Sequence, residues 1–121
     1  MKTVVNPKMI DTDCREFQIC NEYNLRIISF NVNGLQKRFI DVQHYMLREN
    51  VDIVCLQETR VEKSFNPRLG GYKIFTKTKD EGIQGLVTIV RNNIAATELD
   101  INFGPGTENQ AFSITYRGNS F

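Results

Sequence analysis

Two asparagines and one glutamate follow hydrophobic segments, at positions where their side chains could do chemistry. Asn31 and Asn33 lie near the end of the stretch ISFNVNGL, and Glu58 follows the apolar run VDIVCLQ. A glutamate at a strand end can hold a hard divalent cation such as Mg²⁺, which takes one or two protein carboxylates and leaves its other positions to water and phosphate. An amide nearby offers a donor and an acceptor that can orient a phosphate or a carboxylate.

The same residue types also serve as ordinary turn formers and caps at strand ends. The dipeptide Asn33-Gly34 is typical of a turn, and a turn is enough to explain an asparagine at position 33. Asn31 is not explained by that turn. Position alone therefore leaves open both the binding and the structural interpretation.

The segments around these residues predict a strand, a helix and a second strand. Residues 25–32 are rich in apolar and β-branched side chains and predict a largely buried strand, and residues 51–57 predict a covered strand. Between them, apolar residues recur at spacings of four, three and four, which predicts one face of a helix running to about Asn50. These apolar residues are Leu35, Phe39, Val42 and Met46.

This order favours a right-handed parallel βαβ unit. Because ligands collect beyond the carboxyl ends of parallel strands, we expect Asn31 and Glu58 to face one shared edge of the sheet.

After the βαβ unit, the pattern favours antiparallel strands without another helical crossover. Residues 72–78, 85–91, 94–101 and 110–117 predict consecutive strands of a meander that continues the same sheet. Residues 1–23 show no sustained period and predict an irregular extension, so we place the domain at residues 24–121. The fold class is therefore α/β, with one mixed sheet.

Composition excludes several classes of protein. Lys and Arg total 15 against 14 Asp and Glu, so the net charge of +1 provides no general attraction for nucleic acid or membrane. The chain has no apolar run near the roughly 20 residues that span a bilayer, and no secretory signal, which favours an intracellular protein without a membrane partner. Cys14, Cys20 and Cys55 form no CxxC pair, which argues against a disulfide framework or a zinc site.

One strand carries a candidate phosphate-binding surface. Lys73, Lys77 and Lys79 stand at even spacings, as on one face of a strand, and Tyr72 and Phe75 lie beside them. Such residues can contact a nucleic-acid backbone, but the alternation is equally typical of an amphipathic strand with a solvated face.

The motifs SFNVNGL and DIVCLQET together resemble the first two motifs of the endonuclease/exonuclease/phosphatase superfamily of Mg²⁺-dependent phosphodiesterases. A third element, GIQGLVTIV at residues 82–90, resembles the glycine-containing strand that follows in that family. The resemblance implies that Glu58 binds the metal, Mg²⁺ or Mn²⁺, and that Asn31 hydrogen-bonds at the scissile phosphate of DNA.

Two departures from the DNA repair members of this family point to another branch. Asn33 stands where many repair nucleases have aspartate, and Phe30 stands where tryptophan is common. The sequence is more similar to the apurinic-type endonuclease domains of non-LTR retrotransposons, which implies a nuclear site of action and gives Asn33 a supporting role.

The resemblance implies a four-layer αββα sandwich of DNase I type, of which this chain matches the N-terminal half. The family's catalytic histidine, oriented by an aspartate, is expected in a later segment. His44 precedes the glutamate motif and is expected to be an ordinary surface residue of the helix. We therefore expect a truncated domain that is inactive without its C-terminal half, with unpaired strand edges and one sheet face uncovered.

Three alternatives remain at this stage. The chain could derive from a phosphatase of the same superfamily that acts on inositol phosphates or sphingolipids, or from an abasic-site repair nuclease. It could also be a non-catalytic relic or binding fragment, since it has no candidate base beyond His44.

Overall fold

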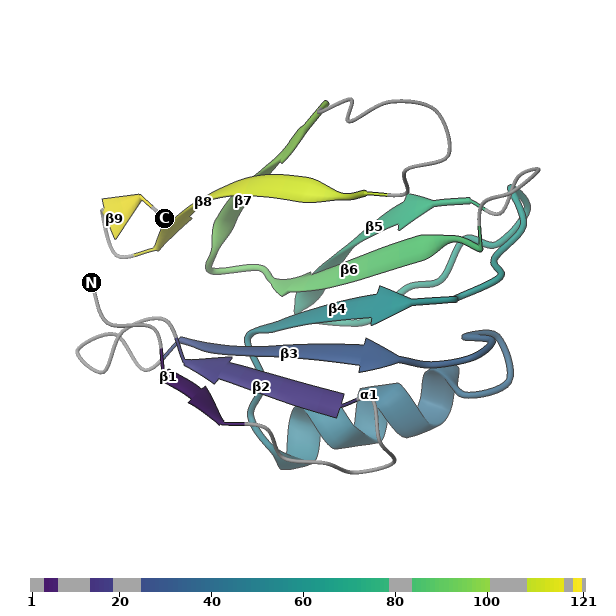
Figure 1. Cartoon of the computed structure of the whole chain (residues 1–121), viewed down its shortest axis with the longest axis horizontal. Coiled ribbons are helices and arrows are strands. Elements are labelled where there is room, and N and C mark those ends of the chain that lie inside the picture. Colours follow the sequence, from purple (N-terminus) through teal and green to yellow (C-terminus); the bar gives the residue numbers. More distant parts are fainter. Residues whose placement is uncertain are drawn as a thin grey trace.

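A mixed sheet carries the candidate site in the computed structural model, which describes residues 4–6, 14–18, 25–78, 84–100, 109–116 and 119–120. Six strands of the described segments form this larger sheet, in the order β1-β2-β3-β4-β6-β5 (Figure 1). In chain order the six strands are β1 Val4–Asn6, β2 Cys14–Gln18, β3 Arg26–Asn31, β4 Ile53–Gln57, β5 Tyr72–Lys77 and β6 Leu86–Arg91.

The predicted βαβ unit is present. β3 and β4 are parallel neighbours, with Ile27 opposite Ile53 and Asn31 opposite Gln57. The helix α1, Phe39–Arg48, connects them. The two strands therefore end at the same edge of the sheet, as the sequence predicted.

Helix α1 packs through the apolar face that the sequence predicted, but it begins later. Val42 and Met46 are buried, whereas Leu35 is buried in the turn that precedes the helix. At the other end, Asn50 adopts a left-handed conformation with φ of 52°, and the Val51 N–H donates to the Met46 carbonyl at 3.0 Å. Asparagine tolerates this conformation better than most residues, which explains why the helix stops here.

The predicted meander is confirmed only for its first hairpin. β5 and β6 pair antiparallel, and β6 lies between β5 and β4. Because β6 already has a neighbour on each side, the next strand cannot add to it. Instead β7 Ala95–Leu99, β8 Ala111–Tyr116 and β9 Asn119–Ser120 form a separate three-stranded sheet, so the expectation that they continue the first sheet is wrong. The outer ends of two predicted strands, residue 101 and residue 117, lie outside the described residues.

The N-terminal region also differs from the expectation. Residues 1–23 were expected to be irregular, but β1 and β2 form within them, and β2 pairs antiparallel with β3 along five residue pairs. β4 pairs with only one edge of β3, which leaves the backbone donors and acceptors of the other edge without partners. β2 pairs with these groups, although the side chains of β2 show only a weak strand pattern. The rest of 1–23 lies outside the described residues.

Both faces of the central strands are covered. One core joins α1 to the sheet through Ile28, Val54, Leu56 and their neighbours. A second core lies on the opposite face, where Leu25, Ile53, Val90 and Ile94 contact partly buried residues of β5, β7 and β8, namely Phe75, Ala96 and Ile114. The expectation of an uncovered face is therefore wrong for this part of the sheet.

These elements form three layers: α1, the larger sheet and the smaller sheet (Figure 1). The four-layer sandwich remains a prediction. Within the described segments, no helix is long and apolar enough to cross a membrane.

Candidate functional site

Asn31 and Glu58 meet at the carboxyl ends of β3 and β4. Asn31 is the last residue of β3, and Glu58 directly follows β4. The Nδ2 group of Asn31 donates a hydrogen bond to Oε2 of Glu58, and both residues are partly buried. The structure thus confirms that the two residues share one edge of the sheet; their chemical roles remain predictions.

Strand alternation decides on which face this pair lies. Ile28 and Phe30 contact the core beneath α1. Ser29 and Asn31 therefore point to the other face, because successive side chains of a strand alternate. The site lies on the face that the smaller sheet covers elsewhere.

Asn33 joins the site through its backbone. The backbone N–H of Asn33 donates to Oδ1 of Asn31 at 3.2 Å, and Asn33 is exposed to solvent. Both ends of the Asn31 amide are thereby engaged, since the oxygen accepts from Asn33 and the nitrogen donates to Glu58. This pattern sets the orientation of the amide group.

The connection after β3 is tied to the connection after β4 by backbone hydrogen bonds. Gly34 N–H donates to the Glu58 carbonyl at 2.8 Å, and Leu35 N–H donates to the Thr59 carbonyl at 2.9 Å. These bonds extend the β3–β4 pairing past the strand ends. Glu58 therefore lies in a turn whose backbone is held by hydrogen bonds to the loop after β3.

Glu58 and two residues near the pair have left-handed backbone conformations. φ is 48° at Asn33, 50° at Glu58 and 54° at Arg60. Such a conformation costs about 1–2 kcal/mol for a residue with a side chain, so surrounding contacts must compensate. Clusters of this kind occur at binding and catalytic sites, where the backbone is held in one working geometry.

The start of β6 supports the same turn from the other side. Thr59 N–H donates to the Gly85 carbonyl at 3.2 Å, and Arg60 N–H donates to the Gln84 carbonyl at 2.7 Å. Thr59 ends the motif DIVCLQET and Gly85 lies in the third motif, yet the sequence did not indicate that they touch. A glycine immediately before a strand was the available signal.

Gln57 does not join the site. Its Nε2 group donates to Ser29 Oγ at 2.9 Å and to the Cys55 carbonyl at 3.1 Å.

Burial raises the pKa of the neighbouring Cys55 thiol above its ordinary value, and a hydrogen bond with Thr88 opposes this shift. Cys55 is therefore a neutral thiol at physiological pH rather than a nucleophile.

In the described segments, no group of three or more His, Cys, Asp and Glu side chains comes together. Glu58 would supply a carboxylate oxygen to a metal at this site, with amide, backbone or water oxygens at other positions. One carboxylate with several waters is an ordinary ligand set for Mg²⁺.

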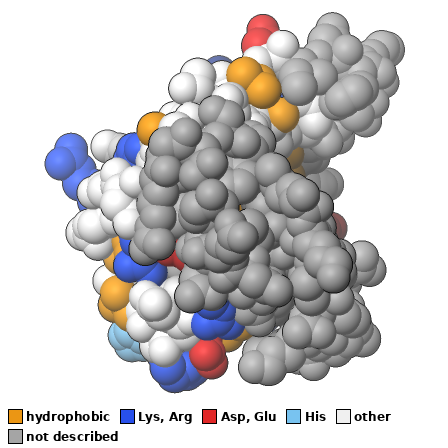
Figure 2. Space-filling view, turned by 90° about the vertical axis from the view of Figure 1, so that its left-hand side faces the viewer, with side chains coloured by type: hydrophobic (Ala, Val, Ile, Leu, Met, Phe, Trp, Pro, Cys, Tyr) orange, Lys and Arg blue, Asp and Glu red, His pale blue; other side chains and the backbone are white. Residues whose placement is uncertain are grey.

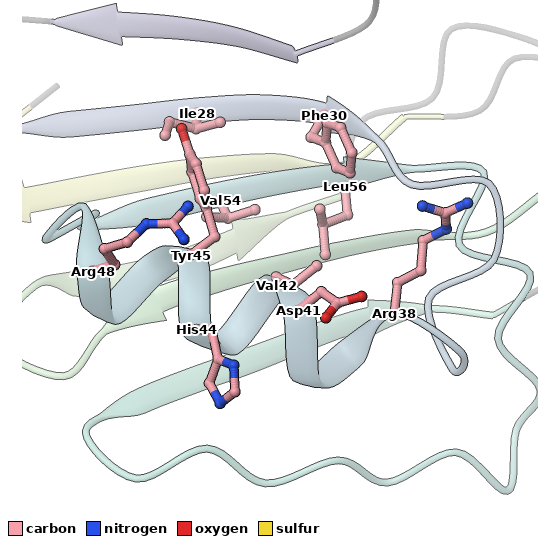
Figure 3. A pocket seen from close by; sticks show the side chains of 10 residues that line it. All are labelled: Ile28, Phe30, Arg38, Asp41, Val42, His44, Tyr45, Arg48, Val54 and Leu56. Atoms are coloured by element: carbon pink, nitrogen blue, oxygen red, sulfur yellow. The ribbon is translucent and has the colours of Figure 1, made fainter. Parts of the chain in front are cut away.

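His44 lies on the other side of the sheet. It is an exposed residue of α1 that lines a groove of about 350 Å³, together with Phe30 and Leu56. Figure 3 shows the imidazole directed away from the sheet, and Figure 2 shows it at the surface near Lys and Arg side chains. Since Phe30 and Asn31 point to opposite faces, this groove is separate from the Asn31–Glu58 pair.

The lysines of β5 have structural partners. Nζ of Lys73 donates to the Ile94 carbonyl, and Nζ of Lys77 donates to the Asn109 carbonyl, each at 2.7 Å. Tyr72 is buried, and Phe75 packs edge-on against Phe112 with ring centroids 4.9 Å apart. Both lysines therefore hold the segments that flank the smaller sheet; Lys79 lies outside the described residues.

Comparison with known proteins identifies relatives of this chain. The model of the Endonuclease/Exonuclease/phosphatase family matches residues 28–118. An "Exodeoxyribonuclease" of Bacillus subtilis (strain 168) is 45% identical over 40 residues, which are 31% of this chain and 16% of that protein. A "Probable RNA-directed DNA polymerase from transposon X-element" of Drosophila melanogaster is 26% identical over 74 residues, 59% of this chain and 8% of that protein. The chain thus spans a small part of the length of either relative.

Proposed function

Because the chain belongs to the Endonuclease/Exonuclease/phosphatase family, we propose that Asn31 and Glu58 form one side of a metal-dependent phosphodiesterase centre. The observation that supports this function best is the hydrogen bond between the two side chains at the ends of parallel strands. Members of α/β folds bind ligands at this kind of edge.

Mg²⁺ fits the residues of the site, and Mn²⁺ can take its place. Glu58 supplies a hard carboxylate oxygen, and the metal when bound would neutralise charge on the phosphate. Asn31 has two amide N–H donors, of which one is used by Glu58. Among the described residues no acceptor is recorded for the second N–H, so Asn31 would offer it to a phosphate oxygen and orient the phosphodiester beside the carboxylate.

Among the residues that the structure describes, no histidine lies beside Asn31 and Glu58 to act as the general base of this reaction. The chain's single histidine, His44, lies on the opposite face of the sheet from Asn31. We therefore propose that this chain binds metal and phosphodiester but does not hydrolyse it alone, and that a base from a complementary C-terminal half completes the domain.

DNA is the proposed substrate, in an endonuclease of retroelement type that acts in the nucleus. Asn33 and Phe30 favour this branch over the repair enzymes. The similarity to the Drosophila transposon protein extends over 74 residues and gives further support. Among enzymes, the alternative is a phosphatase or an abasic-site repair nuclease of the same family. The non-catalytic alternative is a relic or a binding fragment, which is consistent with the position of His44 away from the site.

Metal-dependent DNA binding tests this proposal. We expect fluorescence anisotropy of a labelled DNA duplex to show binding that requires Mg²⁺, that is lost in Glu58→Gln and that is retained in Glu62→Gln. Glu62 is an exposed glutamate four positions further on and serves as the matched control. Stronger competition by inositol phosphates than by unlabelled DNA would favour a phosphatase, and DNA binding that ignores Mg²⁺ and Glu58 would contradict the proposal.

A plasmid-nicking assay tests the missing base. The chain alone is expected to leave supercoiled plasmid intact in Mg²⁺. Nicking that disappears in Glu58→Ala would show that the base lies within these 121 residues.

A further inference from the structure

Gly85 approaches the Glu58 turn more closely than any larger residue could. It directly precedes β6, is buried, and has a left-handed backbone with φ of 94°. A Cβ atom at this position would lie 2.7 Å from Thr59 Oγ1 and 3.3 Å from the Arg60 amide nitrogen. A separation under 3.0 Å is not tolerated by real Cβ atoms, so either β6 or the Thr59 side chain would have to move.

Thr59 cannot move away easily. The residue is 1% exposed, so the surrounding core leaves its side chain little room to turn. Its backbone is held on both sides, because its N–H donates to Gly85 and its carbonyl accepts from Leu35. A displacement of Thr59 would therefore be transmitted to the residue before it, Glu58.

The backbone around Glu58 links these contacts to the site. The Glu58 carbonyl accepts from Gly34 N–H at 2.8 Å, and the carboxylate accepts from Asn31. Glu58 thus lies between the loop after β3 and the start of β6. A side chain at Gly85 that displaced Thr59 would therefore shift the Glu58 turn toward Asn31.

We propose that Gly85 is a positioning residue for the Glu58 carboxylate. The absence of a side chain at Gly85 lets β6 close on Thr59, and this contact holds the Glu58 turn in the geometry that binds metal. The consequence for metal affinity rests on the proposed function of Glu58. The consequence for backbone geometry depends only on the contacts described above.

Gly85→Ala tests the proposal, with Gly71→Ala as the matched control. Gly71 also has a left-handed backbone, with φ of 86°, but no atom lies within 4 Å of a Cβ placed there. Both variants therefore carry the same conformational strain, and only Gly85→Ala creates the contact with Thr59. Mn²⁺ binding followed by electron paramagnetic resonance is expected to weaken about tenfold in Gly85→Ala, as for other residues that orient a metal ligand, and to stay near wild type in Gly71→Ala.

Removing the obstructing atom should reverse the effect. In the double variant Thr59→Ala/Gly85→Ala, we expect Mn²⁺ affinity to recover most of what Gly85→Ala loses. Equal losses in Gly71→Ala and Gly85→Ala, or no recovery in the double variant, would overturn the proposal. If Gly85→Ala does not fold, recovery of folding in the double variant supports the proposal, and failure of both to fold overturns it.

A second readout separates this inference from the metal site itself. The amide resonances of Gly34 and Leu35 report the hydrogen bonds to the Glu58 and Thr59 carbonyls without any metal. They should shift in Gly85→Ala and return in the double variant. If Glu58→Gln leaves Mn²⁺ affinity unchanged while Gly85→Ala shifts these amide resonances, the metal proposal fails and the positioning role of Gly85 stands. If Gly85→Ala leaves the amide resonances unchanged, the positioning role is overturned.

Discussion

The side-chain amide of Asn31 donates to the carboxylate of Glu58, although 27 positions separate the two residues in the chain. The parallel pairing of β3 and β4 brings them together, because it places Asn31 opposite Gln57, the residue before Glu58. The contact therefore depends on the register of two strands and on the turn that follows each of them.

Asn31→Asp should destabilise the chain and make it more dependent on divalent metal. The substitution replaces a hydrogen-bond donor with a second carboxylate beside Glu58, and we expect a loss of about 1–3 kcal/mol in the free energy of unfolding. Urea denaturation with and without Mg²⁺ measures this, and Mg²⁺ should restore part of the loss. Asn33→Asp is the control, since Asn33 is exposed and joins the site through its N–H; equal losses in the two variants would contradict the account.

Arg91 should be a larger contributor to stability than an exposed arginine. Its Nε atom lies 3.0 Å from Oδ1 of Asp52, its NH2 group donates to the Val51 carbonyl at 2.9 Å, and its guanidinium lies over the Tyr72 ring. We expect Arg91→Met to lower the free energy of unfolding by about 2 kcal/mol, because it removes the cationic partner of the partly buried Asp52 carboxylate and one of the donors to the Val51 carbonyl.

Arg48→Met provides the comparison for Arg91. Arg48 is exposed and lies 3.8 Å from Glu49, a surface pair of the kind worth at most about 1 kcal/mol. Urea titrations of both variants should show a clear difference in midpoint. Similar midpoints would show that the Arg91 contacts contribute little.

Gln110→Ala should loosen the smaller sheet from the larger one. Gln110 accepts from Thr88 Oγ1 at 2.7 Å and donates to the Phe75 carbonyl at 3.3 Å. Loss of these bonds to partly buried groups is expected to cost about 1–2 kcal/mol. Hydrogen exchange should then speed up in β8 more than in β4, whereas Thr115→Ala, at an exposed position of β8, should change neither strand. Equal acceleration in both strands would contradict a local role.

Cys55 should make the stability of the chain fall at alkaline pH. Burial raises the pKa of its thiol above the ordinary value of 9.0, so the folded chain keeps this proton after the unfolded chain has lost it. The stabilisation is fully present below the unfolded pKa and is lost as pH rises through the folded pKa. Unfolding titrations of wild type and Cys55→Ala between pH 7.5 and 10 should therefore converge as pH rises. A difference that stays constant over this range would refute the shift.

The sequence contained enough information to predict the βαβ unit and the pairing of the site residues. The spacing of Val42 and Met46 gave the buried face of α1, and the apolar run before Glu58 gave β4. Because parallel strands joined by one helix end at the same edge, the element order predicted that Asn31 and Glu58 share an edge. The hydrogen bond between them also depends on the strand register, which the sequence did not predict.

The strand neighbours could not be predicted in the same way. β6 lies beside β4 and leaves β5 at the edge, and β2 pairs with β3 despite a weak pattern of its own. Such choices depend on contacts between distant segments, which local periodicity does not report. The contact between Gly85 and Thr59 is a result of the same pairing, since it exists only because β6 lies next to β4.

The proposed role of Glu58 is to hold a divalent metal beside Asn31. Its most direct test is the Mn²⁺ dissociation constant, measured by electron paramagnetic resonance for wild type, Glu58→Gln and Glu62→Gln. We expect Glu58→Gln to weaken binding at least about tenfold, because the amide replaces the carboxylate that is proposed to hold the metal, and Glu62→Gln to bind as wild type does. Equal affinities in all three proteins would contradict the claim.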